Sequence, residues 1–318
     1  MGVGERPSTA LVLPTLNAGP DFIYWLAALH EQTVRPDRLL LVDSSSTDGT
    51  PAMAREFGFE VQSLKREEFS NGGTRQRYVD QLEDSDLIIF LTPDALLSTP
   101  EALECLLKWF DDSKIGAAYG RQLPRKVAGR IETHAWLFNY PDKSRVKSVD
   151  DIPELGLKTS FISNSFAAYR RSALQEVGGF PSHTIQNEDT YAASQMILKG
   201  WKVVYEAKAT VYHSHSFSWL QDFRRYFDVG VYHARDPWIR EIFGQGGGTD
   251  DRFVRSELEY LKKVRPLAIP SAIIRTALKL FGYNLGNHNR FLPQGLKKLM
   301  STNRAYWRQT RSNEEEKV

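Results

Sequence analysis

Short apolar runs alternate with amphipathic segments along the first third of the chain. The runs at 10–13, 39–42 and 87–91 hold no polar residue, a pattern typical of strands buried on both faces of a sheet. Another strand is predicted at 59–64. A helix is predicted to start near Pro51. Another helix, earlier in the chain, is predicted from apolar residues at helical spacing: Phe22, Trp25, Leu26 and Leu29. This alternation predicts an α/β fold with a parallel sheet and right-handed crossovers.

Two aspartates follow these buried runs directly. Asp43 ends the run at 39–42, and Asp94 follows the run at 87–91, where Pro93 lacks the N–H that a central strand needs. Ligands of open α/β sheets bind at the carboxyl ends of the strands. Asp43 can accept hydrogen bonds from a base or ribose, and its alternative role is a turn bonded to its own backbone. The alternative for Asp94 is a helix cap.

A glycine pair precedes a further predicted helix. The segment Asn71-Gly72-Gly73-Thr74-Arg75 is expected to form a loop before a helix through 76–82. Paired glycines permit a close backbone approach, and a helix N-terminus attracts anions, so Arg75 can reach a phosphate. A plain Gly-Gly turn is the alternative.

The second third of the chain predicts fewer regular elements. Four apolar runs are expected to be strands: 114–119, 159–169, 202–205 and 209–212. The polar stretch 124–153 is interpreted as a long loop with a helix near 131–138 that lines a cleft. Such a loop would exclude water from a substrate.

Composition narrows the class of protein. The chain has 318 residues, 41% of them hydrophobic, and a net charge of +2, which fits one large globular domain with an appendage. The single cysteine, Cys105, excludes an internal disulfide and fits a reducing compartment. No apolar run approaches the roughly 20 residues that span a bilayer, and residues 1–9 lack a secretory signal. We therefore expect a cytoplasmic protein.

The strand-end motifs occur in an order that carries a family resemblance. They are Pro14-Thr-Leu-Asn17, Val42-Asp43-Ser-Ser-Ser-Thr-Asp48-Gly-Thr50 and Thr92-Pro-Asp94-Ala95. With the later segments 177–181, 187–189 and 199–204, they resemble GT-A glycosyltransferases of family 2 over about residues 8–245. Within that family, the segments 72–75, 92–95 and 211–215 are similar to bacterial rhamnosyltransferases.

The resemblance implies a GT-A fold with a mostly parallel central sheet at 1–245, divided into a nucleotide-sugar half at about 8–120 and an acceptor half at 121–245. It implies inverting transfer of L-rhamnose from dTDP-rhamnose to a saccharide acceptor, which can be lipid-linked, in cell-surface polysaccharide biosynthesis. Alternatives are a UDP-hexose donor and, more remotely, a non-catalytic binding module. The expected nucleotide-sugar contacts are Pro14, Thr15, Asn17, Asp43, Ser45, Gly73, Arg75, Thr92, Asp94, Ala95 and Asn164.

The expected metal site departs from the family pattern. Thr92 stands where the first acid of a DxD motif would be, which leaves Asp94 as the carboxylate. Divalent metals in such sites take oxygen ligands and sometimes imidazole. By resemblance, Asp94 and His213 hold Mg²⁺ or Mn²⁺, with His215 as the alternate because residues i and i+2 of a strand point the same way.

Two acids begin a predicted helix at Glu188. Their negative charge interacts favourably with the positive end of the helix dipole. This stabilisation alone would explain why acids stand at the start of the helix. By resemblance, Asp189 is the general base that removes the proton of the acceptor hydroxyl, and Glu188 orients Asp189 or the acceptor. A positioned base contributes about 10²–10⁴-fold to such a rate.

The last part of the chain is basic and predicted to be helical, with helices at 219–232, 238–243 and 252–264 and a flexible joint at 246–248. From Asp251 on, 14 Lys and Arg stand against 6 Asp and Glu, a local balance of +8. The extension 246–318 is expected to lie on the inner face of the cell membrane, to pack on the catalytic domain or to form a homo-oligomer interface. Nucleic acid is disfavoured, because this basic excess accompanies aliphatic residues and no reading motif. The end, 314–317, is expected to be disordered.

Overall fold

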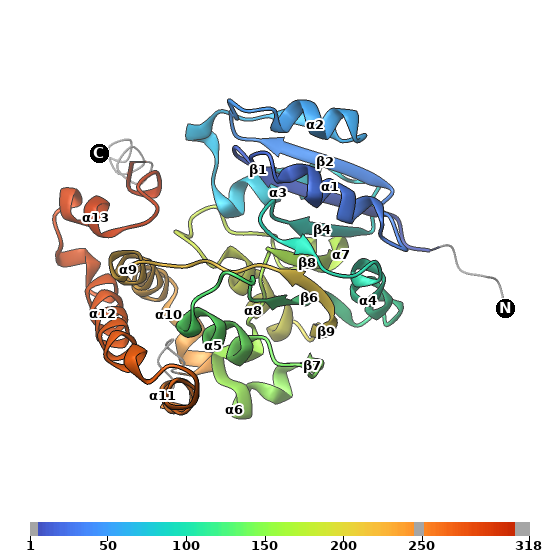
Figure 1. Cartoon of the computed structure of the whole chain (residues 1–318). Coiled ribbons are helices and arrows are strands. Elements are labelled where there is room, and N and C mark those ends of the chain that lie inside the picture. The colour runs from blue at the N-terminus through green and yellow to red at the C-terminus, as the bar shows by residue number, and fades with distance from the viewer. Residues whose placement is uncertain (1–5, 245–250, 309–318) are drawn as a thin grey trace, which may run out of the picture.

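The computed structural model describes residues 6–244 and 251–308. A nine-stranded sheet forms its centre, in the order β3-β2-β1-β4-β8-β6-β9-β5, with β7 paired to β9 (Figure 1). The strands are β1 (Thr9–Thr15), β2 (Arg38–Asp43), β3 (Glu60–Ser63), β4 (Leu87–Leu91), β5 (Leu96–Leu97), β6 (Ile115–Leu123), β7 (Arg145–Lys147), β8 (Phe166–Arg170) and β9 (Lys202–Tyr212).

The N-terminal half of the sheet is parallel, as the apolar runs predict. β1 pairs with both β2 and β4, and the register sets Thr15 opposite Asp43. The crossovers run through α1 (Phe22–His30), α2 (Thr50–Glu56) and α3 (Asn71–Gln81). The carboxyl ends of β1, β2 and β4 therefore meet at one edge, where the predicted nucleotide contacts lie.

Beyond β4 the sheet becomes mixed, because β8 runs antiparallel to both β4 and β6. Leu91 at the end of β4 stands opposite Phe166 at the start of β8. The turn before β8 therefore lies at the same edge as the residues that follow β4, and it brings Asn164 to the site.

Three expected boundaries are wrong. The strand predicted at 159–169 begins only at Phe166, because Lys147 Nζ binds the carbonyls of Lys158 and Phe161 in the irregular segment before it. The runs at 202–205 and 209–212 form one strand, β9. The loop expected at Asn71 is already the first turn of α3.

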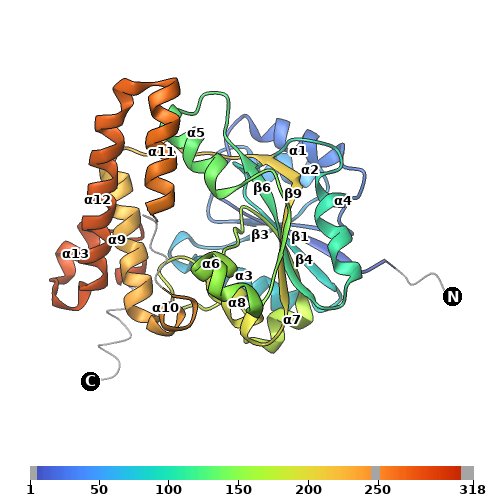
Figure 2. The same cartoon turned by 90° about the horizontal axis from the view of Figure 1, so that it is seen from below.

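Helices cover both faces of the sheet (Figure 2). One apolar core forms beneath α1, α2 and α4 (Ala102–Leu107), and the other beneath α3, α7 (Arg171–Glu176) and α8 (Glu188–Leu198). The helix expected near 131–138 is α5 (Arg130–Asn139), and the short α6 (Ile152–Leu155) follows it. The long polar stretch therefore does carry its predicted helix.

The C-terminal helices form a layer beside the sheet (Figures 1 and 2). Their bounds are α9 (Trp219–Arg235), α10 (Pro237–Phe243), α11 (Asp251–Val264), α12 (Ile269–Asn287) and α13 (Gln294–Met300). The three helices predicted here are confirmed with longer bounds, whereas 246–248 and 314–317 lie outside the described residues.

Helix α12 packs tightly along α9. A Cβ added at Gly286 would lie 2.0 Å from the Phe227 carbonyl oxygen, and one at Gly282 would lie 2.4 Å from that of Phe223. Glycine lets the two backbones approach closely. The C-terminal extension therefore packs on α9, a helix that lies before residue 246. Within the described ranges, no helix combines the length and apolar character that crossing a bilayer requires.

Candidate active site

A cleft of about 1630 Å³ opens at the carboxyl edge of the sheet, between α5 and α9. Asp94, Asp189, His213 and His215 all line it. The structure thus brings together the predicted base and the predicted metal ligands, which lie far apart in the sequence.

Asp94 lies in the turn after β4, and two histidines that follow the end of β9 lie close to its carboxylate. His213 Nε2 is 3.4 Å and His215 Nε2 is 3.3 Å from Asp94 Oδ2. The Thr92 hydroxyl donates a hydrogen bond to Asp94 Oδ1. Ligand atoms of Asp94 and both histidines lie within 4.8 Å of one another, so the geometry assembles both histidines and does not select one.

The charge of this cluster suits a divalent cation. His213 Nδ1 lies 2.8 Å from the Gln122 amide oxygen, a contact that orients the ring with Nε2 toward Asp94. With a metal ion bound, Nδ1 would hold the hydrogen and Nε2 would offer its lone pair to the ion. Burial opposes ionisation of Asp94, but the hydrogen bonds from His213 and Thr92 and the nearby His215 outweigh it and hold the pKa of Asp94 well below its usual range. One carboxylate and two imidazoles fit a transition metal such as Mn²⁺.

Glu188 begins α8 beneath the second carboxylate of the cleft. Asn187, with φ 62°, turns the chain through the left-handed region immediately before the helix. Glu188 Oε1 accepts from Arg75 Nη1 at 2.9 Å and from Asn164 Nδ2 at 3.1 Å, and this ion pair is buried. The Tyr169 hydroxyl donates to Asn164 Oδ1 at 2.8 Å. Glu188 is therefore committed to a buried network and is not open to solvent.

Asp189 stands on that network and faces the cleft. Its Oδ2 accepts from the Asn164 backbone N–H at 3.1 Å, and its Oδ1 accepts from that of Thr190 at 2.7 Å. Burial and the neighbouring Glu188 carboxylate raise the pKa of Asp189 above its ordinary value of 3.8 and outweigh these two hydrogen bonds. A fixed carboxylate with a raised pKa is suited to accept a proton.

The glycine pair has a packing role. A Cβ at Gly72 would lie 1.8 Å from the Pro181 carbonyl oxygen, so α3 approaches the segment before α8 more closely than any other residue would allow. That approach carries Arg75 to Glu188. Gly73 lies in the same first turn of α3, and Arg75 is buried beneath Asp189, away from the cleft lining. Contact of Gly73 or Arg75 with a phosphate stays a prediction.

The other nucleotide-sugar candidates cluster at the ends of β1, β2 and β4. Asp43 accepts from the Ser46 backbone N–H at 3.1 Å, which is the turn bond that the sequence left open for it. Asn17 and Ser45 both have positive φ. Ala95 is buried, and its carbonyl accepts from Trp25 Nε1. Pro14 and Thr15 end β1, Thr92 lines the cleft, and Asn164 supports Asp189. Their nucleotide contacts stay predictions.

Sequence reasoning missed three polar residues near Asp94. Gln122 fixes the His213 ring, and Arg125 donates to the Asp94 carbonyl at 2.6 Å. Arg225 of α9 lines the cleft, with its guanidinium 4.1 Å from the centroid of the Phe217 ring. Each lies outside the strand-end motifs, so no local pattern marks it.

A parallel sheet edge with a strand-end aspartate, facing a helix-start carboxylate across one cleft, defines a nucleotide-sugar transferase of the GT-A class. Mannosyltransferase PcManGT from Pyrobaculum calidifontis, solved with GDP-Man and Mn²⁺, shares the fold with a TM-score of 0.56 at 19% identity, over 96% of this chain and 86% of its own.

The chain belongs to glycosyltransferase family 2. The family Glycosyl transferase family 2 matches residues 10–178, more than half of the chain. The chain is 44% identical to the O-antigen chain rhamnosyltransferase WbaN of Salmonella anatum, over 95% of this chain and 96% of WbaN. It is 46% identical to the O-antigen chain rhamnosyltransferase RfbN of Salmonella typhimurium, over 93% and 95%.

Proposed function

We propose that this glycosyltransferase moves L-rhamnose from dTDP-rhamnose to a saccharide acceptor in cell-surface polysaccharide biosynthesis, with inversion at the anomeric carbon. The observation that carries the proposal is the identity of 44% and 46% to two O-antigen chain rhamnosyltransferases over nearly the whole chain. The cytoplasmic location and the homo-oligomer stay predictions.

Asp189 is the base in this proposal. As the acceptor oxygen attacks the anomeric carbon, its proton moves to Asp189 and the bond from that carbon to the diphosphate oxygen breaks. One base opposite the leaving group gives inversion. Glu188, Asn164 and Arg75 would position Asp189. Arg75 Nη1 and Asn164 Nδ2 donate to the Glu188 carboxylate at the start of α8, and the Asn164 backbone N–H donates to Asp189. The raised pKa of Asp189 makes it a stronger base than an exposed aspartate.

Asp94, His213 and His215 would hold Mg²⁺ or Mn²⁺ at the other side of the cleft, and the ion would neutralise charge on the departing diphosphate. Arg225 and Arg125 add positive charge beside the same cluster. Asp43 and its neighbours at the ends of β1 and β2 would receive the nucleoside, and the acceptor would enter past α5.

Calorimetric titration with dTDP, dTDP-rhamnose, UDP and UDP-glucose, each with Mn²⁺ or with a chelator, tests the proposal. We expect metal-dependent binding of the thymidine ligands alone. Preference for UDP-glucose would replace the donor by a UDP-hexose and keep the base. Absence of nucleotide binding under all conditions would contradict the enzymatic proposal and favour a non-catalytic binding module.

A further inference from the structure

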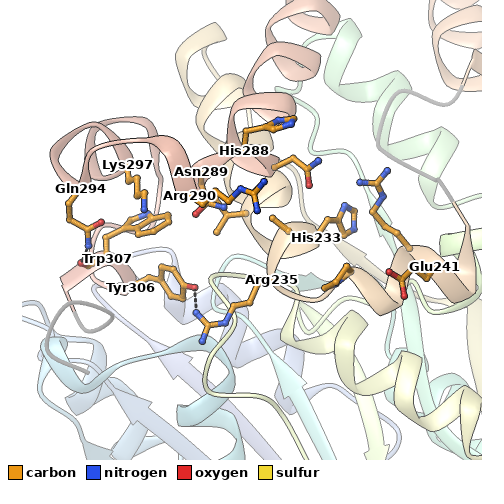
Figure 3. Close-up of a pocket in the computed structure, with 15 residues that line it drawn as sticks. His233, Arg235, Glu241, His288, Asn289, Arg290, Gln294, Lys297, Tyr306 and Trp307 are labelled. Carbon is orange, nitrogen blue, oxygen red and sulfur yellow. Dashed lines mark hydrogen bonds between the residues drawn. The ribbon is translucent and has the colours of Figure 1, made fainter. Parts of the chain in front are cut away.

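A second cavity, of about 840 Å³, lies between α9, α10, the end of α12 and α13 (Figure 3). Four cationic side chains line it: Arg235, Arg240, Arg290 and Lys297. Glu241 is the one carboxylate among the described residues that line it. The cavity therefore concentrates positive charge contributed by four separate elements.

These cations rest on aromatic rings and hydroxyls. Figure 3 shows Arg235 bonded to the Tyr306 hydroxyl, at 2.8 Å, and Lys297 near Trp307, with its Nζ 5.3 Å from the ring centroid. In the part of the chain that the structure describes, no carboxylate oxygen lies within 4.0 Å of the charged nitrogens of the four cations. Their charge is thus held in place and not neutralised, which favours an anionic ligand.

Two histidines line this cavity, His233 and His288, and His233 carries no charge near pH 7. Burial and the positive charge of Arg240 lower the pKa of His233 to about 4. His233 is therefore neutral near pH 7 and adds nothing to the charge of the four cations and Glu241.

Exposed apolar side chains stand beside these cations in the sequence. Phe291, 70% exposed, follows Arg290, and Leu296, 40% exposed, precedes Lys297. Leu299, 56% exposed, lies one turn after Leu296 on the same side of α13. Helix α12 exposes more apolar residues: Ile273, Ile274, Leu280 and Phe281. Apolar side chains next to cations are typical of surfaces that enter the boundary of an anionic bilayer.

We propose that this cavity binds the anionic phosphate of a membrane lipid, with Phe291, Leu296 and Leu299 contacting the apolar part of the bilayer. The cavity is concave and admits a head group, and the cations reach it from α9, α10, α13 and the segment between α12 and α13. The proposal is independent of the sugar that the enzyme transfers, because it concerns a cavity separate from Asp94 and Asp189.

Cosedimentation with phosphatidylcholine vesicles, with and without phosphatidylglycerol, tests this proposal on the full chain. We expect binding only when phosphatidylglycerol is present. The variant Arg290→Gln/Lys297→Gln should bind about 30-fold more weakly, since each cation near an anionic surface contributes about 1 kcal/mol. Phe291→Ser/Leu299→Ser should also bind more weakly. The matched control Arg55→Gln/Lys114→Gln, which removes two exposed cations on the opposite half of the molecule, should bind like the wild type.

Far-ultraviolet circular dichroism confirms that each variant is folded. Equal vesicle binding by the wild type and Arg290→Gln/Lys297→Gln would overturn the proposal, as would an equal loss in the control variant, which would indicate a non-specific charge effect. Calorimetry with inorganic diphosphate completes the test: binding of diphosphate without vesicle binding would also overturn it. A third outcome would assign the surface to a second copy of the chain instead. The wild type would then form a stable dimer in analytical ultracentrifugation and bind no vesicles, and Phe291→Ser/Leu299→Ser would be monomeric. None of these readouts uses a sugar nucleotide, so they are independent of the test of rhamnosyl transfer.

Discussion

Asp94 and Asp189 face the same cleft from opposite surroundings. The hydrogen bonds from His213 and Thr92 and the nearby His215 lower the pKa of Asp94 despite its burial. Asp189 receives only two backbone N–H groups and lies beside Glu188, so burial and the like charge raise its pKa. The same residue type is thereby kept ionised at one side of the cleft and made harder to ionise at the other.

The difference supports the two proposed roles. A carboxylate that stays ionised is suited to hold a cation, and one with a raised pKa is suited to take a proton. Each proposed role depends on neighbouring residues that can be substituted one at a time. The role of Asp94 and the role of Asp189 can therefore be tested separately.

The largest effect is expected from Asp189→Asn. The amide cannot accept the proton, so kcat should fall about 10²–10⁴-fold, while binding of dTDP should stay unchanged because Asp189 is not among the proposed nucleotide contacts. Initial rates and calorimetry on the same preparation measure both quantities. An unchanged kcat would remove Asp189 from the mechanism.

Asp94→Asn should change metal dependence instead. Loss of the only carboxylate in the cluster should weaken Mn²⁺ binding by more than the roughly 10–100-fold that removing a hydrogen-bond partner of a ligand costs. Titration of the nucleotide-bound enzyme with Mn²⁺ gives this affinity. Wild-type Mn²⁺ affinity in the variant would place the ion elsewhere.

Gln122→Met tests the orientation of His213 with a smaller expected effect. Without the amide oxygen on Nδ1, the ring loses its fixed tautomer, and Mn²⁺ affinity should fall about 10–100-fold. The same substitution at the exposed Gln175 of α7 is the control and should leave the affinity unchanged. Equal affinities in the two variants would contradict the role of Gln122.

The pH profile gives the smallest change. Asp189 must be ionised to act, so kcat should rise with pH through its raised pKa, falling about tenfold per pH unit below it, and the acid limb should lie above 3.8. Glu188→Gln removes the like charge and leaves the Arg75 cation, so the limb should move to lower pH. A limb that stays in place would show that Glu188 does not act on the Asp189 pKa.

The strands of the N-terminal half could be predicted because burial on both faces leaves an unbroken apolar run. The continuity of β9 could not, because Glu206 and Lys208 interrupt its apolar pattern. Glu206 is accommodated by Trp109 Nε1, at 2.7 Å and 97 residues away, and by Ser144 Oγ at 2.9 Å. Such a partner is visible only once the chain has folded.

The site divides in the same way. Asp94, Asp189 and His213 could be singled out as candidates because each stands in a motif at the end of a strand or the start of a helix, and the structure places all three in one cleft. The partners that set their chemistry could not, because Arg75 and Glu188 are separated by 113 residues, and Gln122 and His213 by 91. Local patterns indicate the candidate reacting groups, and long-range contacts set their surroundings.

The contact between Gly72 and Pro181 bears on how such enzymes can be recombined. It joins the half proposed to receive the nucleotide to the half proposed to hold the base, and it brings Arg75 within reach of Glu188. A chimera that takes its first half from one relative and its second from another inherits the two sides of this contact from different parents. We expect such a chimera to keep this contact where the first parent carries glycine at the position of Gly72 and arginine at that of Arg75, and the second carries glutamate at that of Glu188.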